Sequence, residues 1–246
     1  MSFKHLEDGL PAGQVEPYLD LFGKLQEPTK TVFGYTLDLA SFLKKEGLTN
    51  HYLVFGGYSV LSHLMTSNGP EIARTWRGSS DIDMAGDGAV LLALRRDYDM
   101  HSDLASPNIN DKRTLKLTTN GEEECKIDFS QGAFRKKYGA AEVNEHFGVP
   151  LSVLCPRDII KGKLYTPIGE EQHIGDILGM LSVLERRGVK PEEIVSLFSG
   201  VERSEFYKRL VHGNCLFEKD RFGIFPTRNF FRKVLDRLSK RALVAA

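Results

Sequence analysis

The segment Arg77-Gly-Ser-Ser-Asp-Ile-Asp83 places two aspartates two residues apart in a stretch that favours a β-strand. Side chains alternate between the faces of a strand, so Asp81 and Asp83 are predicted on one face and Ile82 on the other. Two neighbouring carboxylates resist joint ionisation, and a divalent cation between them would relieve their repulsion. The segment therefore predicts a strand that presents metal-binding oxygens.

Upstream of this segment, a short strand is predicted to lead through a glycine turn into a helix. Tyr52-Leu-Val-Phe55 is β-prone and ends at Gly56-Gly57, after which Tyr58 to Met65 returns to helical spacing. Glycines at such a turn allow the backbone to approach an anion near the helix N-terminus. Structural turns of this kind are also common, so both interpretations stay open.

Downstream, a third aspartate is predicted on a later strand of the same sheet. Residues 113–119 and 124–129 alternate with period two around Asn120-Gly121, which favours a hairpin. The second of these strands carries Asp128. Three carboxylates on one sheet would supply the hard oxygen ligands that Mg²⁺ or Mn²⁺ prefers, as in two-metal phosphoryl-transfer sites.

The rest of the chain changes from strands to helices. The first fifteen residues are expected to lack regular structure. Thr75 to Arg77 is expected to begin the strand that carries Asp81. Residues 99–103 are expected to form a loop. The predicted fold class is α+β: a mixed sheet flanked by helices in residues 1–154, then a helical domain in residues 155–246. The predicted helices cover residues 15–26, 31–47, 58–65, 89–95, 157–165, 174–187, 191–199, 204–211 and 229–242.

Composition narrows the class of protein without identifying a partner. The chain has 246 residues, and its 33 Lys and Arg equal its 33 Asp and Glu, so only local charge can indicate a nucleic-acid partner. Three cysteines without metal-ligand spacing predict reduced thiols, and neither a signal peptide nor a membrane span is expected. These features predict a cytoplasmic protein with no membrane partner.

Taken together, three motifs resemble the DNA polymerase β-type nucleotidyltransferase superfamily, and within it the AbiEii-type toxins and related minimal nucleotidyltransferases. The motifs are Gly56-Gly-Tyr-Ser59, then Arg77 to Asp83, then Lys126-Ile-Asp128. Lys163-Leu164 and Asp176-Ile-Leu-Gly-Met-Leu181 are similar to the family's later helical segments. The similarity spans roughly residues 50 to 185.

The resemblance implies a role for each matching residue. Asp81, Asp83 and Asp128 would bind Mg²⁺ or Mn²⁺. Asp128 would also act as the carboxylate that assists as general base. Gly56, Gly57 and Ser59 would hold the nucleotide phosphates. Lys163, with Lys161 as its alternative, would be the catalytic lysine that neutralises the triphosphate, and Asp176 would orient this lysine. Arg77 would brace the site or contact a phosphate.

The sequence departs from the family pattern after the lysine. The stretch from Thr166 to Gln172 lacks the arginine expected there, and His173 stands where a basic–acidic pair is usual. Lys161 and Lys163 therefore stay alternatives for the phosphate-binding role.

The resemblance implies transfer of an NMP from an NTP to an acceptor hydroxyl, with release of pyrophosphate. The AbiEii-type similarity further implies the toxin of a toxin–antitoxin pair, with a tRNA as acceptor and an antitoxin protein as partner. Alternatives that stay open are a protein or small-molecule acceptor, or a non-catalytic nucleotide-binding module of the same fold.

The C-terminal stretch combines a basic face with an apolar stripe. Arg228, Arg232, Lys233, Arg237, Lys240 and Arg241 are opposed only by Asp236, while the stripe comprises Phe230, Phe231, Val234, Leu235 and Leu238. This pattern predicts an amphipathic helix docked on the body. Its basic face is either simply solvated or a contact for an RNA backbone.

Overall fold

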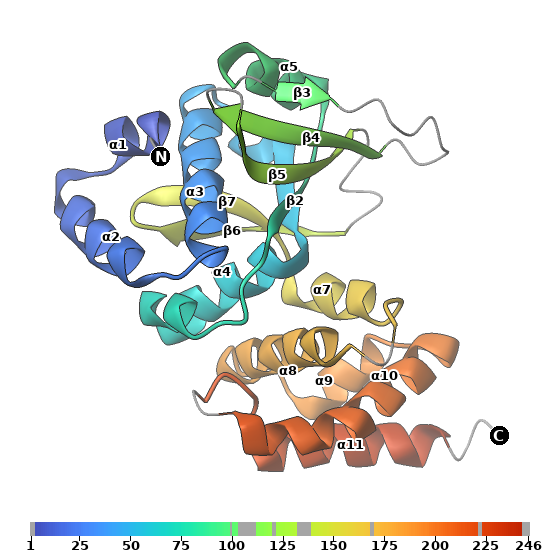
Figure 1. Cartoon of the computed structure of the whole chain (residues 1–246). Helices are drawn as coiled ribbons and strands as arrows, with labels where there is room; N and C mark the ends of the chain where they lie inside the picture. The colour runs from blue at the N-terminus through green and yellow to red at the C-terminus, as the bar shows by residue number, and fades with distance from the viewer. Residues whose placement is uncertain are drawn as a thin grey trace. The chain divides into compact units, whose positions relative to one another are not determined.

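The computed structural model describes residues 3–98, 100–102, 112–119, 122–131, 139–167, 170–220 and 223–242. The chain divides into two compact units, Met1–Cys155 and Pro156–Ala246, where the sequence predicted a boundary after residue 154. The first unit contains a sheet with helices, and the second consists of helices (Figure 1).

The first unit is built on a seven-stranded sheet of order β3-β4-β5-β2-β1-β7-β6. The sheet is mixed, because β2 runs parallel to β5 and β1 parallel to β7, while the other neighbours are antiparallel. The strands are β1 (Tyr52–Phe55), β2 (Asp81–Gly86), β3 (Met100–Ser102), β4 (Lys112–Thr119), β5 (Glu122–Gln131), β6 (Ala141–His146) and β7 (Val149–Leu154).

Helices of the first unit surround this sheet. The longest, α3, is buried over most of its length and contacts β7, β5 and β2. Its Phe33 ring lies 6.3 Å from the ring of Tyr58 in α4. The helical segments are α1 (Lys4–Gly9), α2 (Ala12–Lys24), α3 (Thr29–Lys45), η1 (Thr49–His51), α4 (Gly56–Asn68), η2 (Pro70–Arg74) and α5 (Gly88–Asp97).

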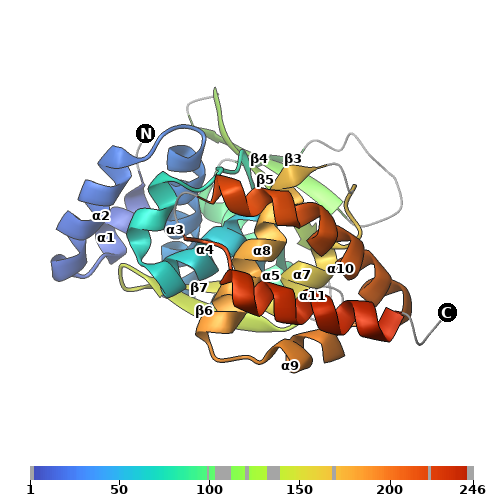
Figure 2. The same cartoon turned by 90° about the horizontal axis from the view of Figure 1, so that it is seen from below.

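The second unit is helical throughout its described part, and α11 packs against α9 and α10 (Figure 2). No helix in the described part of the chain is long and apolar enough to cross a membrane. Its segments are α7 (Pro156–Lys163), α8 (Glu171–Arg186), α9 (Pro191–Ser196), α10 (Gly200–Gly213), η3 (Asn214–Lys219) and α11 (Arg228–Ala242).

The predicted fold class is confirmed: a mixed sheet with flanking helices is followed by a helical region. The predicted pairing of residues 113–119 with 124–129 is also confirmed as β4 and β5. The Asn120-Gly121 turn between them lies outside the described residues.

Three local predictions were wrong. Of the first fifteen residues, which were expected to be loose, residues 3–15 are described and are not loose, because α1 buries Leu6 completely and Asp38 accepts a hydrogen bond from the Leu6 amide at 2.8 Å. Residues 75–77 form no strand, since the chain turns at Gly78 with a φ of +85°. Within the predicted 99–103 loop, Met100–Ser102 pairs with β4 as a strand, and residues 99 and 103 lie outside the described ranges.

A polar network is buried between α4 and β6. The Ser62 hydroxyl lies 2.7 Å from His146 Nε2, and Asn144 Nδ2 donates to that hydroxyl at 2.9 Å. His63 Nε2 lies 2.8 Å from the Leu154 carbonyl oxygen. Burial, and secondarily the charge of His63, lower the pKa of His146 from 6.5 to about 4.

This shift predicts a loss of stability in mild acid. His146 is harder to protonate in the folded protein than in the unfolded chain, so its protonation favours unfolding. Its contribution to the unfolding free energy is therefore fully present above the unfolded pKa of 6.5. It is lost as pH falls from 6.5 towards 4, by about 3 kcal/mol in total. Urea denaturation across this range should show a steeper pH dependence for the wild type than for His146→Gln, which cannot titrate. Equal slopes would contradict this role of His146.

Candidate active site

Two neighbouring parallel strands bring the predicted carboxylates together on one face of the sheet. Asp81 on β2 pairs with Lys126 on β5, and Asp83 pairs with Asp128. Ile82 and Ile127, which alternate with them, point to the opposite face and are completely buried. The buried isoleucines fix the orientation of both strands, so the charged side chains must emerge together.

Lys126 is the charged residue of this face to which the sequence analysis gave no role. Its ammonium lies 3.1 Å from both carboxylate oxygens of Asp128. Partial burial opposes its charged form, but the hydrogen bond to Asp128 and the charges of Asp128, Asp81 and Asp83 outweigh this and raise the pKa of Lys126. Its position two residues before Asp128 was the available signal, because residues i and i+2 share a strand face.

One carboxylate oxygen of Asp128 is buried without a hydrogen bond from the described residues. Only its Oδ2 contact with Lys126 has hydrogen-bond geometry, so the buried Oδ1 has no hydrogen-bond partner among the described residues. A buried carboxylate oxygen without such a partner is costly and suits a cation or an incoming donor.

The donor set fits a hard divalent cation, because Asp81, Asp83 and Asp128 offer only oxygen ligands. In the described part of the chain, however, no three His, Cys, Asp or Glu side chains already surround a single metal position. Lys126 supplies the positive charge at Asp128 in this state.

The Gly56-Gly57 turn opens α4 directly against the carboxylates. Gly56 has a φ of +65°, and a Cβ atom there would lie only 1.9 Å from Asp83 Oδ2. A Cβ on Gly57 would approach Ser79 Oγ at 3.0 Å and Arg77 Nη2 at 3.2 Å. The two segments that the sequence marked separately therefore meet here, and the absence of side chains on the glycines permits it.

The loop before β2 is held by local contacts. Ser79 Oγ donates to the backbone oxygen of Asp81 at 3.2 Å, and it lies 3.3 Å from Asp81 Oδ1. The Arg77 guanidinium donates to the Gly78 carbonyl and stacks over the Trp76 ring. These contacts place Arg77 beside the turn, consistent with a bracing role, and its contact with a phosphate stays a prediction.

Ser59 lies one turn into α4 and is completely buried. Its hydroxyl donates to the Gly56 carbonyl at 2.9 Å, so in this structure it stabilises the glycine turn from within. The predicted contact between Ser59 and a nucleotide phosphate stays a prediction.

In the second unit, the partly buried Lys163 forms an ion pair with the buried Asp176. Lys163 Nζ lies 2.9 Å from Asp176 Oδ2 and 3.2 Å from His173 Nδ1, while His173 Nε2 lies 2.6 Å from Glu170. Asp176 therefore orients Lys163. Lys161 forms no ion pair among the described residues, so it remains the alternative for the phosphate-binding role.

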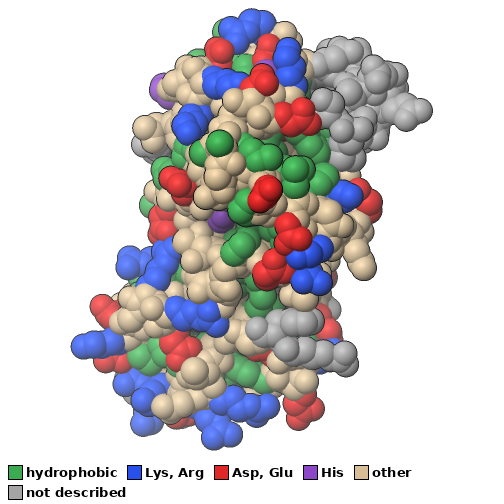
Figure 3. Space-filling model, turned by 90° about the vertical axis from the view of Figure 1, so that its left-hand side faces the viewer, with side chains coloured by type: hydrophobic (Ala, Val, Ile, Leu, Met, Phe, Trp, Pro, Cys, Tyr) green, Lys and Arg blue, Asp and Glu red, His purple; other side chains and the backbone are tan. Residues whose placement is uncertain are grey.

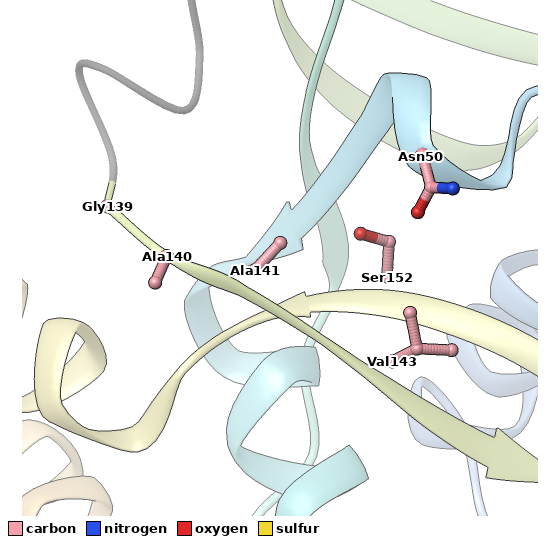
Figure 4. A pocket seen from close by; sticks show the side chains of 6 residues that line it. All are labelled: Asn50, Gly139, Ala140, Ala141, Val143 and Ser152. Carbon is pink, nitrogen blue, oxygen red and sulfur yellow. The ribbon is translucent and has the colours of Figure 1, made fainter.

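One pocket lies at the β6 side of the sheet (Figure 4). By strand register, its Ser152 and Val143 share a sheet face with Asp83, with β1 between them. Among the described residues no charged side chain lines it, so these residues offer it neutral hydrogen-bonding groups and small side chains. Its lining residues are Asn50, Gly139, Ala140, Ala141, Val143 and Ser152.

No model of a known protein family matches this sequence, and no curated protein matches it. Among solved structures, the chain is similar to an antigenic nucleotidyltransferase-like protein from Paracoccidioides brasiliensis. The identity is 14%, the match covers 86% of this chain and 94% of that chain, and the TM-score is 0.43.

A second similarity is to the Megavirus polyadenylate synthase. Its identity is 11%, it covers 85% of this chain and 42% of that chain, and its TM-score is 0.33. Both similarities are remote, so the function is inferred below from the residues of the site. The more specific resemblance to AbiEii-type toxins stays a prediction.

Replacing Gly56 tests whether the turn must approach the carboxylates. Gly56→Ala and Gly47→Ala share a left-handed backbone, but a Cβ at Gly47 meets nothing within 4 Å. The Gly56 variant should therefore lose about 1–3 kcal/mol more unfolding free energy than the Gly47 variant, because Asp83 must shift. Equal losses in urea denaturation would mean that only backbone strain matters at Gly56.

Removing Lys126 tests charge compensation. In metal-free buffer of low ionic strength, Lys126→Met should lower the unfolding free energy by about 1 kcal/mol, because three carboxylates lose their cation. High salt should reduce this loss, and Mg²⁺ should stabilise the variant more than the wild type. Lys4→Met, on the exposed surface of α1, serves as control. Identical salt and Mg²⁺ responses in all three proteins would contradict the compensation.

Proposed function

We propose that this chain is a metal-dependent nucleotidyltransferase that moves an NMP from an NTP to an acceptor hydroxyl. The observation that carries the proposal is the set of three carboxylates and Lys126 on one face of β2 and β5, against a glycine turn that opens α4. Acidic side chains gathered beside a turn without side chains suit a substrate that carries phosphates and a cation.

In this reaction the acceptor oxygen bonds to the α-phosphorus, and the bond from that phosphorus to the β-phosphate oxygen breaks. Pyrophosphate leaves with the electron pair of the broken bond. The acceptor's proton passes to Asp128, whose buried Oδ1 lacks a hydrogen bond among the described residues. Asp81, Asp83 and Asp128 would hold Mg²⁺ or Mn²⁺, which when bound lowers the charge of the triphosphate and the pKa of the attacking hydroxyl.

In this proposal, cationic side chains bind the phosphates of the substrate. With a cation held by the carboxylates, Lys126 would be available to contact the triphosphate instead of Asp128. Arg77 lies at the turn where Gly56 and Gly57 would present the phosphates. By the family resemblance, a lysine at Lys163, with Lys161 as the alternative, would also bind the substrate phosphates.

We infer the acceptor from the AbiEii-type resemblance: the 3′ end of a tRNA, modified by the toxin of a toxin–antitoxin pair. Expression of the chain alone should then slow host growth, and a co-expressed antitoxin should relieve it. Mass spectrometry of cellular RNA and protein after expression would identify the acceptor by its added nucleotide mass. Unimpaired growth with no added mass on tRNA would overturn the tRNA toxin, while added mass on protein would identify a different acceptor.

The transfer reaction itself is tested with each α-labelled NTP, Mg²⁺ and total RNA or protein. Asp81→Asn and Asp128→Asn should each lose transfer at least about a hundredfold, since each removes charge that stabilises the transition state. Asp87→Asn is the matched control, because Asp87 caps α5 through its side chain and asparagine caps equally well.

Two outcomes would contradict the proposal. Transfer that persists unchanged in Asp81→Asn would show that the chemistry lies elsewhere. NTP binding that needs no divalent cation and releases no pyrophosphate with any acceptor would identify a non-catalytic nucleotide-binding module.

A further inference from the structure

The neutral total charge conceals an uneven division between the two units. Residues 156–246 contain 17 Lys and Arg against 12 Asp and Glu, whereas residues 1–155 contain 16 against 21. The helical unit is therefore positively charged, and Figure 3 shows several Lys and Arg side chains along its lower end. A local positive surface on a neutral chain indicates an anionic partner.

Much of this charge lies on the exposed face of α11. Arg228, Arg232, Lys233 and Lys240 are exposed, and Asp236 is the only acidic residue of this helix. Arg237 differs from them, because it pairs with Glu192 of α9 at 3.2 Å. For Arg232, Lys233 and Lys240, the described part of the chain provides no ion pair.

Helix stability does not account for the basic residues at the beginning of α11. The N-terminal end of a helix dipole is positive, so acidic side chains stabilise the first turn and basic ones oppose it. The first turn of α11 has no acidic residue and starts with Arg228, and Arg232 follows one turn later. Only Arg228 lies in the first turn, where the dipole disfavours a cation, and its guanidinium stacks over the Phe217 ring. Arg232 lies beyond the first turn and forms no ion pair among the described residues, so its charge is available to a partner.

We propose that the exposed face of α11 binds the phosphate backbone of a nucleic acid. Repeated cations along one helix face match the repeated charge of a phosphodiester chain. The proposal does not depend on the transfer reaction, but it supplies a binding surface that an RNA acceptor would require.

A membrane surface fits α11 less well than a nucleic acid does. Helices that lie in a bilayer interface insert an apolar face. In α11 the apolar side chains Phe230, Phe231, Val234 and Leu238 are already buried within the unit. The face that remains is charged, so its partner must be recognised through charge.

Binding of a fluorescein-labelled single-stranded RNA to the full chain, measured by anisotropy in EDTA without NTP, tests the proposal. The triple variant Arg232→Gln, Lys233→Gln, Lys240→Gln should raise Kd at least about tenfold and lower the salt slope by about 2, because three phosphate contacts are lost. The control variant Lys24→Gln, Lys208→Gln, Lys219→Gln removes the same charge from lysines that pair with acidic neighbours. The control should bind within about twofold of the wild type, since its lysines are already neutralised.

Three results would overturn the proposal: no RNA binding by the wild type, equal losses in both variants, or binding only to phosphatidylserine vesicles. Circular dichroism confirms that each variant is folded. Because the assay contains neither NTP nor metal, it separates this proposal from the reaction. RNA binding without nucleotide transfer would refute only the reaction, and transfer without α11-dependent binding would refute only the surface.

Discussion

The first unit must hold three like-charged carboxylates on one face of two adjacent strands. Asp81, Asp83 and Asp128 are brought together by the parallel register of β2 and β5, and their repulsion opposes that register. Two features offset this repulsion and maintain the register. The isoleucines that alternate with the aspartates are completely buried on the opposite face, and the ammonium of Lys126 pairs with Asp128. Carboxylates held together in this way are the ligands that we propose for a divalent cation.

The surrounding structure follows from this constraint. The glycine turn can approach Asp83 only because Gly56 has no side chain and adopts a left-handed backbone. Ser59 fixes the turn from within α4, and Ser79 fixes the loop that leads into Asp81. Independently of this constraint, Lys163 and Asp176 form an ion pair within the helical unit at 2.9 Å. Ordered charges on rigid elements are what a reaction on a phosphate ester requires.

Short-range patterns allowed much of this arrangement to be predicted from the sequence. Alternation on a strand placed Asp81 and Asp83 opposite Ile82, and helical spacing located most of the second unit. The strands β6 and β7 were not predicted, because Pro150 interrupts the alternation of β7. They pair locally with each other, but β7 joins the rest of the sheet only through its long-range pairing with β1. Lys126 was given no role although a local signal existed, because it lies two residues before Asp128 and so shares its strand face. Lys161 and Lys163 are both plausible by spacing, and only the contact with Asp176 distinguishes them.

The most direct test is anomalous diffraction from crystals grown with Mn²⁺ and a non-hydrolysable NTP analogue. The account predicts anomalous density bound by Asp81, Asp83 and Asp128, with the Lys126 ammonium moved from Asp128 to the triphosphate. Anomalous density at other residues, or bound nucleotide with Lys126 still paired to Asp128, would contradict it.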